Sequence, residues 1–115
     1  MKIEISENQR RVLIAALDAY SRMKMGQLWA VAEVVRDCKT RTGEPLPEYW
    51  DIREKHTGPL SKALFDYDPN ASHGIVSPLV PDDGKIAHDM QCVLVVRTHK
   101  NIMPVCRSQP LAKVL

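Results

Sequence analysis

Apolar residues recur at intervals of three and four between Ser6 and Gln27, which predicts an amphipathic helix over this range. The apolar stripe comprises Val12, Leu13, Ala16, Leu17, Tyr20 and Met23. Gln9 follows Ser6 at the spacing of a capping box, so we expect the helix to begin there. Gly26, just beyond the last turn, suits a left-handed helix end.

A second apolar stripe predicts another helix from Gly26 or Gln27 to about Arg41, ended by the sequence at 42–45. The two helices form either one rod interrupted at Gly26 or a helical hairpin. Glycine costs about 1 kcal/mol against alanine inside a helix, which weakens the rod interpretation without excluding it.

The middle of the chain predicts shorter elements. Pro47–His56 has the pattern of a short helix with Pro47 as its first residue, and we expect Thr57, Gly58 and Pro59 to break it. One or two further helical turns follow up to Phe65. The range 66–80 is rich in turn-forming residues and predicts a loop.

The last third of the chain is ambiguous between helix and strand. Residues 92–96 favour a strand, but the wider range Ile86–Lys100 has helical spacing and is predicted as a helix, with Asp82 or Asp83 as its N-cap. The tail at 101–115 contains two prolines and should be extended, as an edge strand or along another subunit. The alternation at Lys2–Ile5 predicts a short strand.

These patterns predict a mainly α (α+β) fold: a helical hairpin plus a further long helix, with short strands or extended segments at the termini. At 115 residues the chain is expected to be a single domain, residues 1–115. The net charge of +2 argues against binding to duplex nucleic acid, and no apolar run is long enough to span a membrane. The three cysteines have no CxxC spacing and no signal peptide precedes them, which favours a reducing cytoplasm.

Three polar clusters are candidate binding sites. Arg22, Lys24, Gly26 and Gln27 can hold a phosphate or can form an ordinary solvated helix end, which the residues alone favour. Asn70, Ser72, His73 and Gly74 lie on the predicted loop and can position ligand groups or form an ordinary turn, which the residues favour. The third cluster can bind an anion or simply reach solvent, and consists of Arg97, Thr98, His99 and Lys100, joined by Arg107 and Ser108.

Catalytic chemistry has no clear signature in this sequence. The cysteines have no histidine at an informative spacing, and the four histidines show no HExxH or HxH pattern. The sequence also lacks a GxGxxG motif and a P-loop. We therefore expect a protein that is not an enzyme and that uses no metal and no cofactor.

Four blocks of the sequence carry a family resemblance. LDAYSRMKMGQ is similar to an "ALDLYSRIxMGQ" segment found in small phage-encoded proteins, and NASHGIVSP is similar to their "NSSxGIxSP" loop. KIAHDMQCVLVVRTH resembles their "AYDLxQVIRH" helix, and RSQPLAKV resembles their "TSxxPLxKI" tail. The blocks cover about half of the chain, in the same order. On these residues the chain resembles the phage anti-Thoeris sponge family, type 1.

The resemblance implies a small, oligomeric, non-enzymatic protein in the cytoplasm of an infected bacterial host. Such a protein binds a small anionic nucleotide signal, a cyclic ADP-ribose isomer, and in some members cyclic oligonucleotides, without cleaving it. A homo-oligomer, a dimer or a trimer of dimers, is expected. Two departures put a stacking partner in question: His88 replaces a tyrosine, and Thr98-His99-Lys100 replace a more aromatic segment.

Under this resemblance Arg97, with His99 beside it, would take phosphate, and Asn70, Ser72 or His73 would meet ribose or base. Arg22, Lys24 and Gln27, with Gly26 between them, would form a second anionic site. The alternative is a phage protein-binding module that inhibits a host protein through its apolar helices and its tail.

Overall fold

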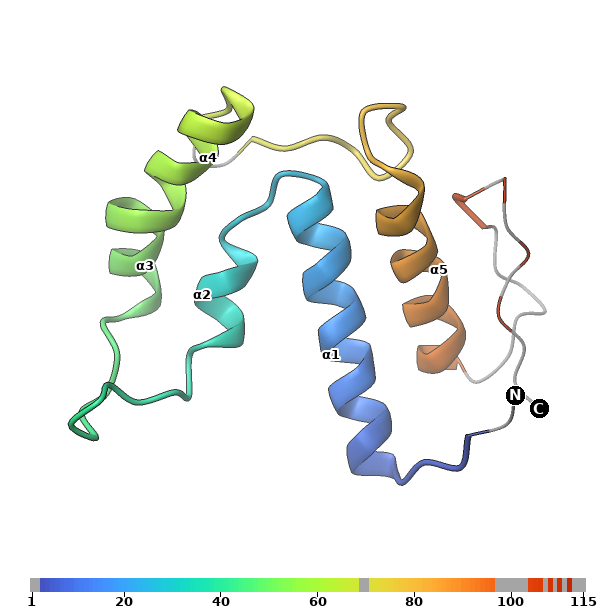
Figure 1. Cartoon of the computed structure of the whole chain (residues 1–115), viewed down its shortest axis with the longest axis horizontal. Coiled ribbons are helices and arrows are strands. Elements are labelled where there is room, and N and C mark those ends of the chain that lie inside the picture. The colour runs from blue at the N-terminus through green and yellow to red at the C-terminus, as the bar shows by residue number, and fades with distance from the viewer. Residues whose placement is uncertain are drawn as a thin grey trace.

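A computed structural model describes residues 3–68, 71–96, 104–106, 108, 110 and 112. Helices dominate this part of the chain, which confirms the mainly α prediction (Figure 1). Their bounds are α1 Glu7–Lys24, α2 Ala30–Val34, α3 Tyr49–Ile52, the π-helical turn η1 Arg53–Thr57, α4 Gly58–Phe65 and α5 Asp82–Val96. Among the described residues the sole β pairing is an isolated bridge between Lys39 and Pro45, and Ile3–Ile5 form no strand, contrary to expectation.

Helix α1 begins as its capping signal predicts. The Ser6 hydroxyl accepts a hydrogen bond from the Gln9 backbone N–H at 3.1 Å, and the Gln9 side chain accepts one from the Ser6 N–H at 2.8 Å. Each bond satisfies a donor that would otherwise lack a partner at the helix N-terminus. The local sequence therefore determines the start of the longest helix.

The end of α1 is a Schellman motif that turns the chain back on itself. Gly26 has a φ of +87°, and its N–H bonds to the Met23 carbonyl at 3.0 Å. The Gln27 N–H bonds to the Arg22 carbonyl at 2.9 Å. Because the chain reverses here, α2 packs beside α1, and the hairpin rather than the rod is observed.

Helix α2 has five residues, far fewer than predicted. After Val34 the chain continues through turns into a small loop, in which the Thr40 N–H bonds to the Glu44 carbonyl at 2.8 Å and Gly43 has a φ of +85°. The Thr40 hydroxyl also accepts the Glu44 N–H at 3.1 Å. Side-chain bonds of this kind compete with helix formation, and they hold the predicted last turn at 40–41 in a non-helical loop.

The third helical region is continuous from Tyr49 to Phe65, so the predicted break at Thr57–Pro59 is wrong. The Gly58 N–H bonds to the Arg53 carbonyl, five residues back, and this wider turn carries the helix past Pro59, which falls in the first turn of α4. Pro47 lies before the N-cap, Glu48, and not at the first helical position as predicted.

Helix α5 is confirmed up to Val96, whereas the predicted range 97–100 lies outside the described residues. Asp82 and Asp83 belong to its first turn and bond to other elements, so neither has the expected role of N-cap. Of the tail predicted to be extended, the described residues are non-helical, and the backbone N–H groups of Val105 and Cys106 bond to the Asp89 carboxylate of α5 at 2.9 and 3.0 Å.

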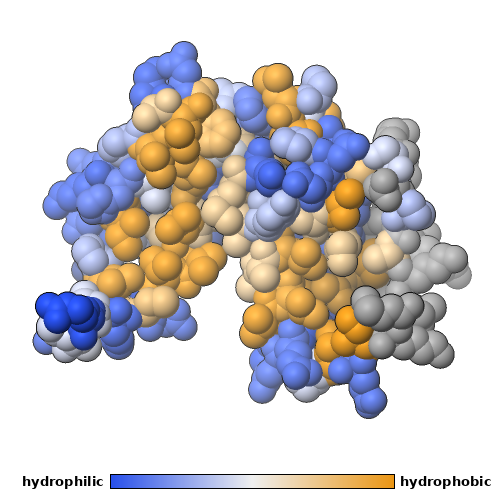
Figure 2. Space-filling view, in the orientation of Figure 1, coloured by the Kyte–Doolittle hydropathy of each residue, from blue (hydrophilic) through white to orange (hydrophobic). Residues whose placement is uncertain are grey.

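The helices form an arch with two limbs (Figure 1). In one limb α1 and α5 run antiparallel and in close contact; in the other, α2 packs against α3 and η1, with α4 above them. Residues 71–81, which we call the crossing loop, run over the top of the arch to α5. The described core is made of small residues: Ala19, Ala30, Ala32, Val80, Ala87, Val93 and Cys106. Figure 2 shows apolar atoms on both limbs facing the notch between them.

In the described part of the chain, no helix combines the length and the apolar character that crossing a bilayer requires.

Candidate functional site

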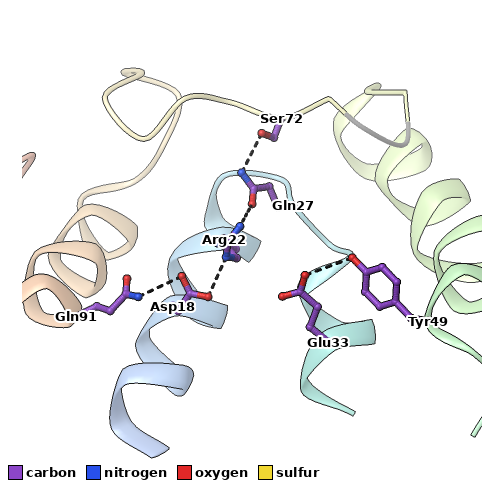
Figure 3. Close-up of polar contacts among 7 residues, drawn as sticks. All are labelled: Asp18, Arg22, Gln27, Glu33, Tyr49, Ser72 and Gln91. Carbon is purple, nitrogen blue, oxygen red and sulfur yellow. Dashed lines mark hydrogen bonds and ion pairs between the residues drawn. The ribbon is translucent and has the colours of Figure 1, made fainter. Parts of the chain in front are cut away.

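A chain of hydrogen bonds crosses the C-terminal end of α1 and joins three elements (Figure 3). Asp18 accepts the Gln91 side-chain amide of α5 at 3.4 Å and Nε–H of Arg22 at 2.9 Å. Arg22 then donates from Nη1 to Gln27 at 3.0 Å, and Gln27 donates to the Ser72 hydroxyl at 3.2 Å. We call these five residues the tip network. It ties α1 to α5 on one side and to the crossing loop on the other.

His73 fixes the crossing loop to the end of α1. Its backbone N–H donates to the Met25 carbonyl at 2.8 Å. Its imidazole Nδ1 hydrogen-bonds to the Tyr67 hydroxyl, and the ring lies edge-on to Phe65 and Tyr67. The ring is therefore part of the packing under the loop, because its Nδ1 and two aromatic neighbours already hold it.

Lys24 is held by an acidic partner on α5. Its Nζ lies 3.1 Å from Oδ2 of Asp83, which also accepts the Tyr20 hydroxyl at 2.8 Å. The hydrogen bonds from Tyr20 and Lys24 lower the pKa of Asp83, and the bond to Asp83 raises the pKa of Lys24. The Lys24 charge is thus already balanced.

The two cations of the first predicted cluster therefore each have a carboxylate neighbour, Asp18 for Arg22 and Asp83 for Lys24. Within the described part of the chain, Nη2 of Arg22 takes part in no hydrogen bond, and 41% of the Arg22 side chain is exposed. An anion approaching the tip can use this nitrogen without displacing Asp18.

The predicted site residues are partly brought together. Arg22, Gln27 and Ser72 share the tip network, and Gly26, Lys24 and His73 lie on the segments that it joins. Asn70, Arg97 and His99 lie outside the described residues, as do Thr98, Lys100 and Arg107. Ser108 donates to Asp82 at 2.7 Å.

Two residues that complete the tip network were missed at the level of sequence. Asp18 is four positions before Arg22, a spacing at which opposite charges on a helix meet, so this signal was available. Gln91 lies 73 positions from Asp18, and no local pattern connects them.

An aromatic cluster on the second limb was also missed. The Arg53 guanidinium lies 4.8 Å from the ring centre of Trp29 and 5.0 Å from that of Trp50, and both distances suit cation–π attraction. The Tyr49 hydroxyl donates to Glu33 of α2 at 3.3 Å, which joins α3 to α2 (Figure 3). Trp50 is nevertheless 67% exposed.

A hollow of about 150 Å³ lies between α1 and α2. It is lined by Ala15, Asp18, Ala19, Ala30, Glu33 and Val34. Its polar groups are two carboxylates on an otherwise apolar floor, so it does not suit a phosphate. A wider, shallower apolar depression lies along α1, lined by Ile5, Asn8, Gln9, Val12 and Leu13.

Metal ligation finds no support within the described residues, which contain no group of three or more histidine, cysteine or acidic side chains placed to hold an ion. The three cysteines differ in solvent exposure: Cys38 is exposed, Cys92 is intermediate and Cys106 is buried.

Comparisons with protein-family models, with curated proteins and with solved structures found no match to this chain.

Proposed function

We propose that this chain is a phage anti-defence protein that binds a cyclic nucleotide immune signal and holds it without cleaving it. The ligand is a cyclic ADP-ribose isomer, with cyclic oligonucleotides as a second ligand class. The protein acts as a homo-oligomer in the cytoplasm of the infected bacterium. The observation that supports the proposal is the meeting of three of the four blocks of family resemblance at one place in the fold.

Three of the blocks meet in the tip network. Asp18, Arg22 and Gln27 belong to the first block, Ser72 to the second and Gln91 to the third. The fourth block joins α5 nearby, where Ser108 bonds to Asp82. Segments that share a motif set and also share contacts are typical of a common site, and here they bring together polar side chains of kinds that bind sugar and phosphate.

The tip network leaves donors for an anionic ligand. Arg22 keeps Nη2 available among the described residues, and a guanidinium is well suited to phosphate. In the proposal Arg97 supplies further positive charge from the segment that follows α5, with His99 beside it, and Asn70 with Ser72 takes the ribose. A binding protein that does not react with its ligand needs no nucleophile, in keeping with the sequence.

Isothermal titration calorimetry with purified cyclic ADP-ribose isomers tests the proposal, followed by heat denaturation and mass spectrometry of the released ligand. We expect tight binding and recovery of the intact ligand. Arg97→Ala should abolish binding, whereas Arg11→Ala, which removes an equal charge from an exposed position of α1, should leave it unchanged. Recovery of a cleaved product would make the protein an enzyme, and unchanged affinity of Arg97→Ala would remove that residue from the site.

A second candidate is a module that binds and inhibits a host protein, and the apolar surface of the arch favours it. Large side chains such as Val12, Leu64 and Trp50 are each more than 60% exposed. Capture of one host protein by the purified chain, with no thermal shift from any cyclic nucleotide, would support this alternative.

A further inference from the structure

The inner surface of the arch is an apolar area that the chain itself leaves uncovered. On α1, the face that carries Val12, Ala15 and Ala19 points away from α5. The short α2 covers this face only near Ala19, which is buried, while Val12 is 68% exposed. Across the notch, Val34 of α2, which also lines the hollow between α1 and α2, is 57% exposed, and Trp50 on the same limb is 67% exposed. Figure 2 shows the apolar atoms of both limbs around this notch.

The accessible area of the chain is larger than that of a compact monomer. The whole chain exposes 8284 Å² and has a radius of gyration of 16.1 Å. A compact protein of 13.0 kDa exposes about 6300 Å² and has a radius of gyration of about 13 Å. The whole chain therefore exposes roughly 2000 Å² more than a compact monomer of its mass, and the exposed apolar side chains of the arch are part of that area.

Charges of opposite sign lie beside this surface on α2 and just after it. Glu33 and Arg36 are three positions apart and both exposed, and both approach Tyr49. Within the described chain no ion pair forms between them. Val34 lies between them in the sequence. Two copies related by a two-fold axis near Val34 would pair Glu33 of each copy with Arg36 of the other, because such an interface is self-complementary.

We propose that a second copy of this chain covers the inner surface of the arch, on a two-fold axis that passes close to Val34. Val34 meets its own counterpart at the axis. Trp50 and Val12 flank the contact, and Glu33 and Arg36 form two reciprocal ion pairs. The exposed tryptophan beside Arg53 has the composition of an interface hot spot. This inference rests on the homo-oligomer of the proposed function and specifies the surface that forms it.

Charge reversal with mixing is the decisive experiment. Glu33→Arg and Arg36→Glu are prepared as two differently tagged proteins, and their masses are measured by sedimentation velocity alone and after mixing. Each variant alone should be a 13.0 kDa monomer, because like charges meet across the axis. The mixture should form a dimer that contains both tags, because both ion pairs are then restored.

Two further variants test the apolar part of the surface. Val34→Arg should abolish dimer formation, and Trp50→Ala should weaken it at least about tenfold. Val76→Arg is the control, because Val76 is 74% exposed but lies on the crossing loop. Circular dichroism checks that each variant keeps the helical content of the wild type.

Three results would overturn the inference: a monomeric wild-type protein at high micromolar concentration, a Val34→Arg variant with the wild-type mass, or a mixture without two-tag dimers. A monomer that associates stoichiometrically with a purified host protein through Val34 would identify a different occupant and would also overturn it. Calorimetry on the same samples separates the two proposals: a wild-type dimer that binds no cyclic nucleotide retains this inference and refutes the proposed function.

Discussion

Lys24 lies directly against Gly84, so the last turn of α1 and the first turn of α5 touch where there is no room for another carbon. A Cβ built on Gly84 would lie 2.7 Å from Cβ of Lys24 and 3.2 Å from Cγ1 of Val80. Both neighbours are held in place, Lys24 by its bond to Asp83 and Val80 by burial in the core. The close approach of the two helices therefore depends on a glycine at position 84.

Gly84→Ala should destabilise the protein, because the added methyl forces α1 and α5 apart. We expect a loss of about 1–3 kcal/mol, typical of overpacking, measured by urea denaturation. Gly74→Ala is the matched control, since a Cβ there meets nothing within 4 Å and its backbone has no positive φ. Equal stability of the two variants would show that the helices separate at little cost.

Gly26→Ala should also destabilise the protein, for a different reason. Its φ of +87° lies in the left-handed region, whereas a Cβ would meet Phe65 only at an ordinary contact distance of 3.5 Å. The cost is therefore conformational, about 1–2 kcal/mol. Gly26→Asn should lose less stability, because asparagine adopts left-handed backbone conformations more readily than alanine does. Thermal denaturation of the two variants tests the order, and a more stable alanine variant would contradict the conformational explanation.

The contribution of Asp83 to stability should depend on pH. The hydrogen bonds from Tyr20 and Lys24 lower its pKa in the folded state. A carboxyl with a lowered pKa contributes stability above its unfolded pKa of about 4, and this is lost as the pH falls through the folded value. The raised pKa of Lys24 has its effect at alkaline pH. The contribution of Lys24 to folding stability is present below about pH 10 and is lost as the pH rises through its pKa in the folded state.

Urea midpoints of the wild type and Asp83→Asn measure this effect between pH 7 and pH 3. The wild type should be the more stable at neutral pH, and the difference should shrink as the pH falls below about 4. Because both partners are exposed to solvent, added salt should also reduce the difference. A difference that is constant across this range would exclude a contribution from the Asp83 charge.

Asp89 should hold the tail against α5. It is 5% exposed, and its two carboxylate oxygens accept the N–H groups of Val105 and Cys106. Asp89→Ala leaves both donors without their acceptor and should cost about 2–3 kcal/mol, whereas Asp89→Asn keeps one acceptor oxygen and should cost less. The thiol of Cys106, 1% exposed, should become reactive in the alanine variant.

Thiol labelling in a background with Cys38→Ser and Cys92→Ser measures this release, because Cys38 is exposed, Cys92 is partly exposed and either could react before Cys106. The background protein alone should label slowly at Cys106. If Asp89→Ala labels at the same slow rate, the carboxylate does not hold the tail.

Local signals in the sequence were sufficient to predict where α1 begins and ends, but not to predict the continuous helical region from Tyr49 to Phe65. Ser6, Gln9 and Gly26 determine the two ends of α1 by bonds that span a few residues. Gly58 and Pro59 also predict a break by local rules, but the chain passes them with a turn in which the Gly58 N–H reaches back to Arg53. Rules for reading helices from a sequence assume hydrogen bonds between residues four positions apart. They therefore do not predict a turn in which the bond spans five positions.

The candidate site was predicted as separate clusters, and the structure supplies the connections among the described members. Gln27 and Ser72 lie 45 positions apart and share a hydrogen bond, which no periodicity can predict. The sequence left Arg22 and Lys24 as either phosphate ligands or a solvated helix end, whereas the fold places carboxylates beside both. The roles of Arg97, His99 and Asn70 stay predictions.

The crossing loop is bonded at its middle, not only at its ends, and this determines how the arch can deform. The Met25 carbonyl holds His73 and the Gln27 amide holds Ser72, so the loop is fixed where the chain leaves α1. We therefore expect the limbs to spread or close by rotation about this point. A spin label at position 74 should then move little, while labels at the N-terminal ends of α1 and α3 separate.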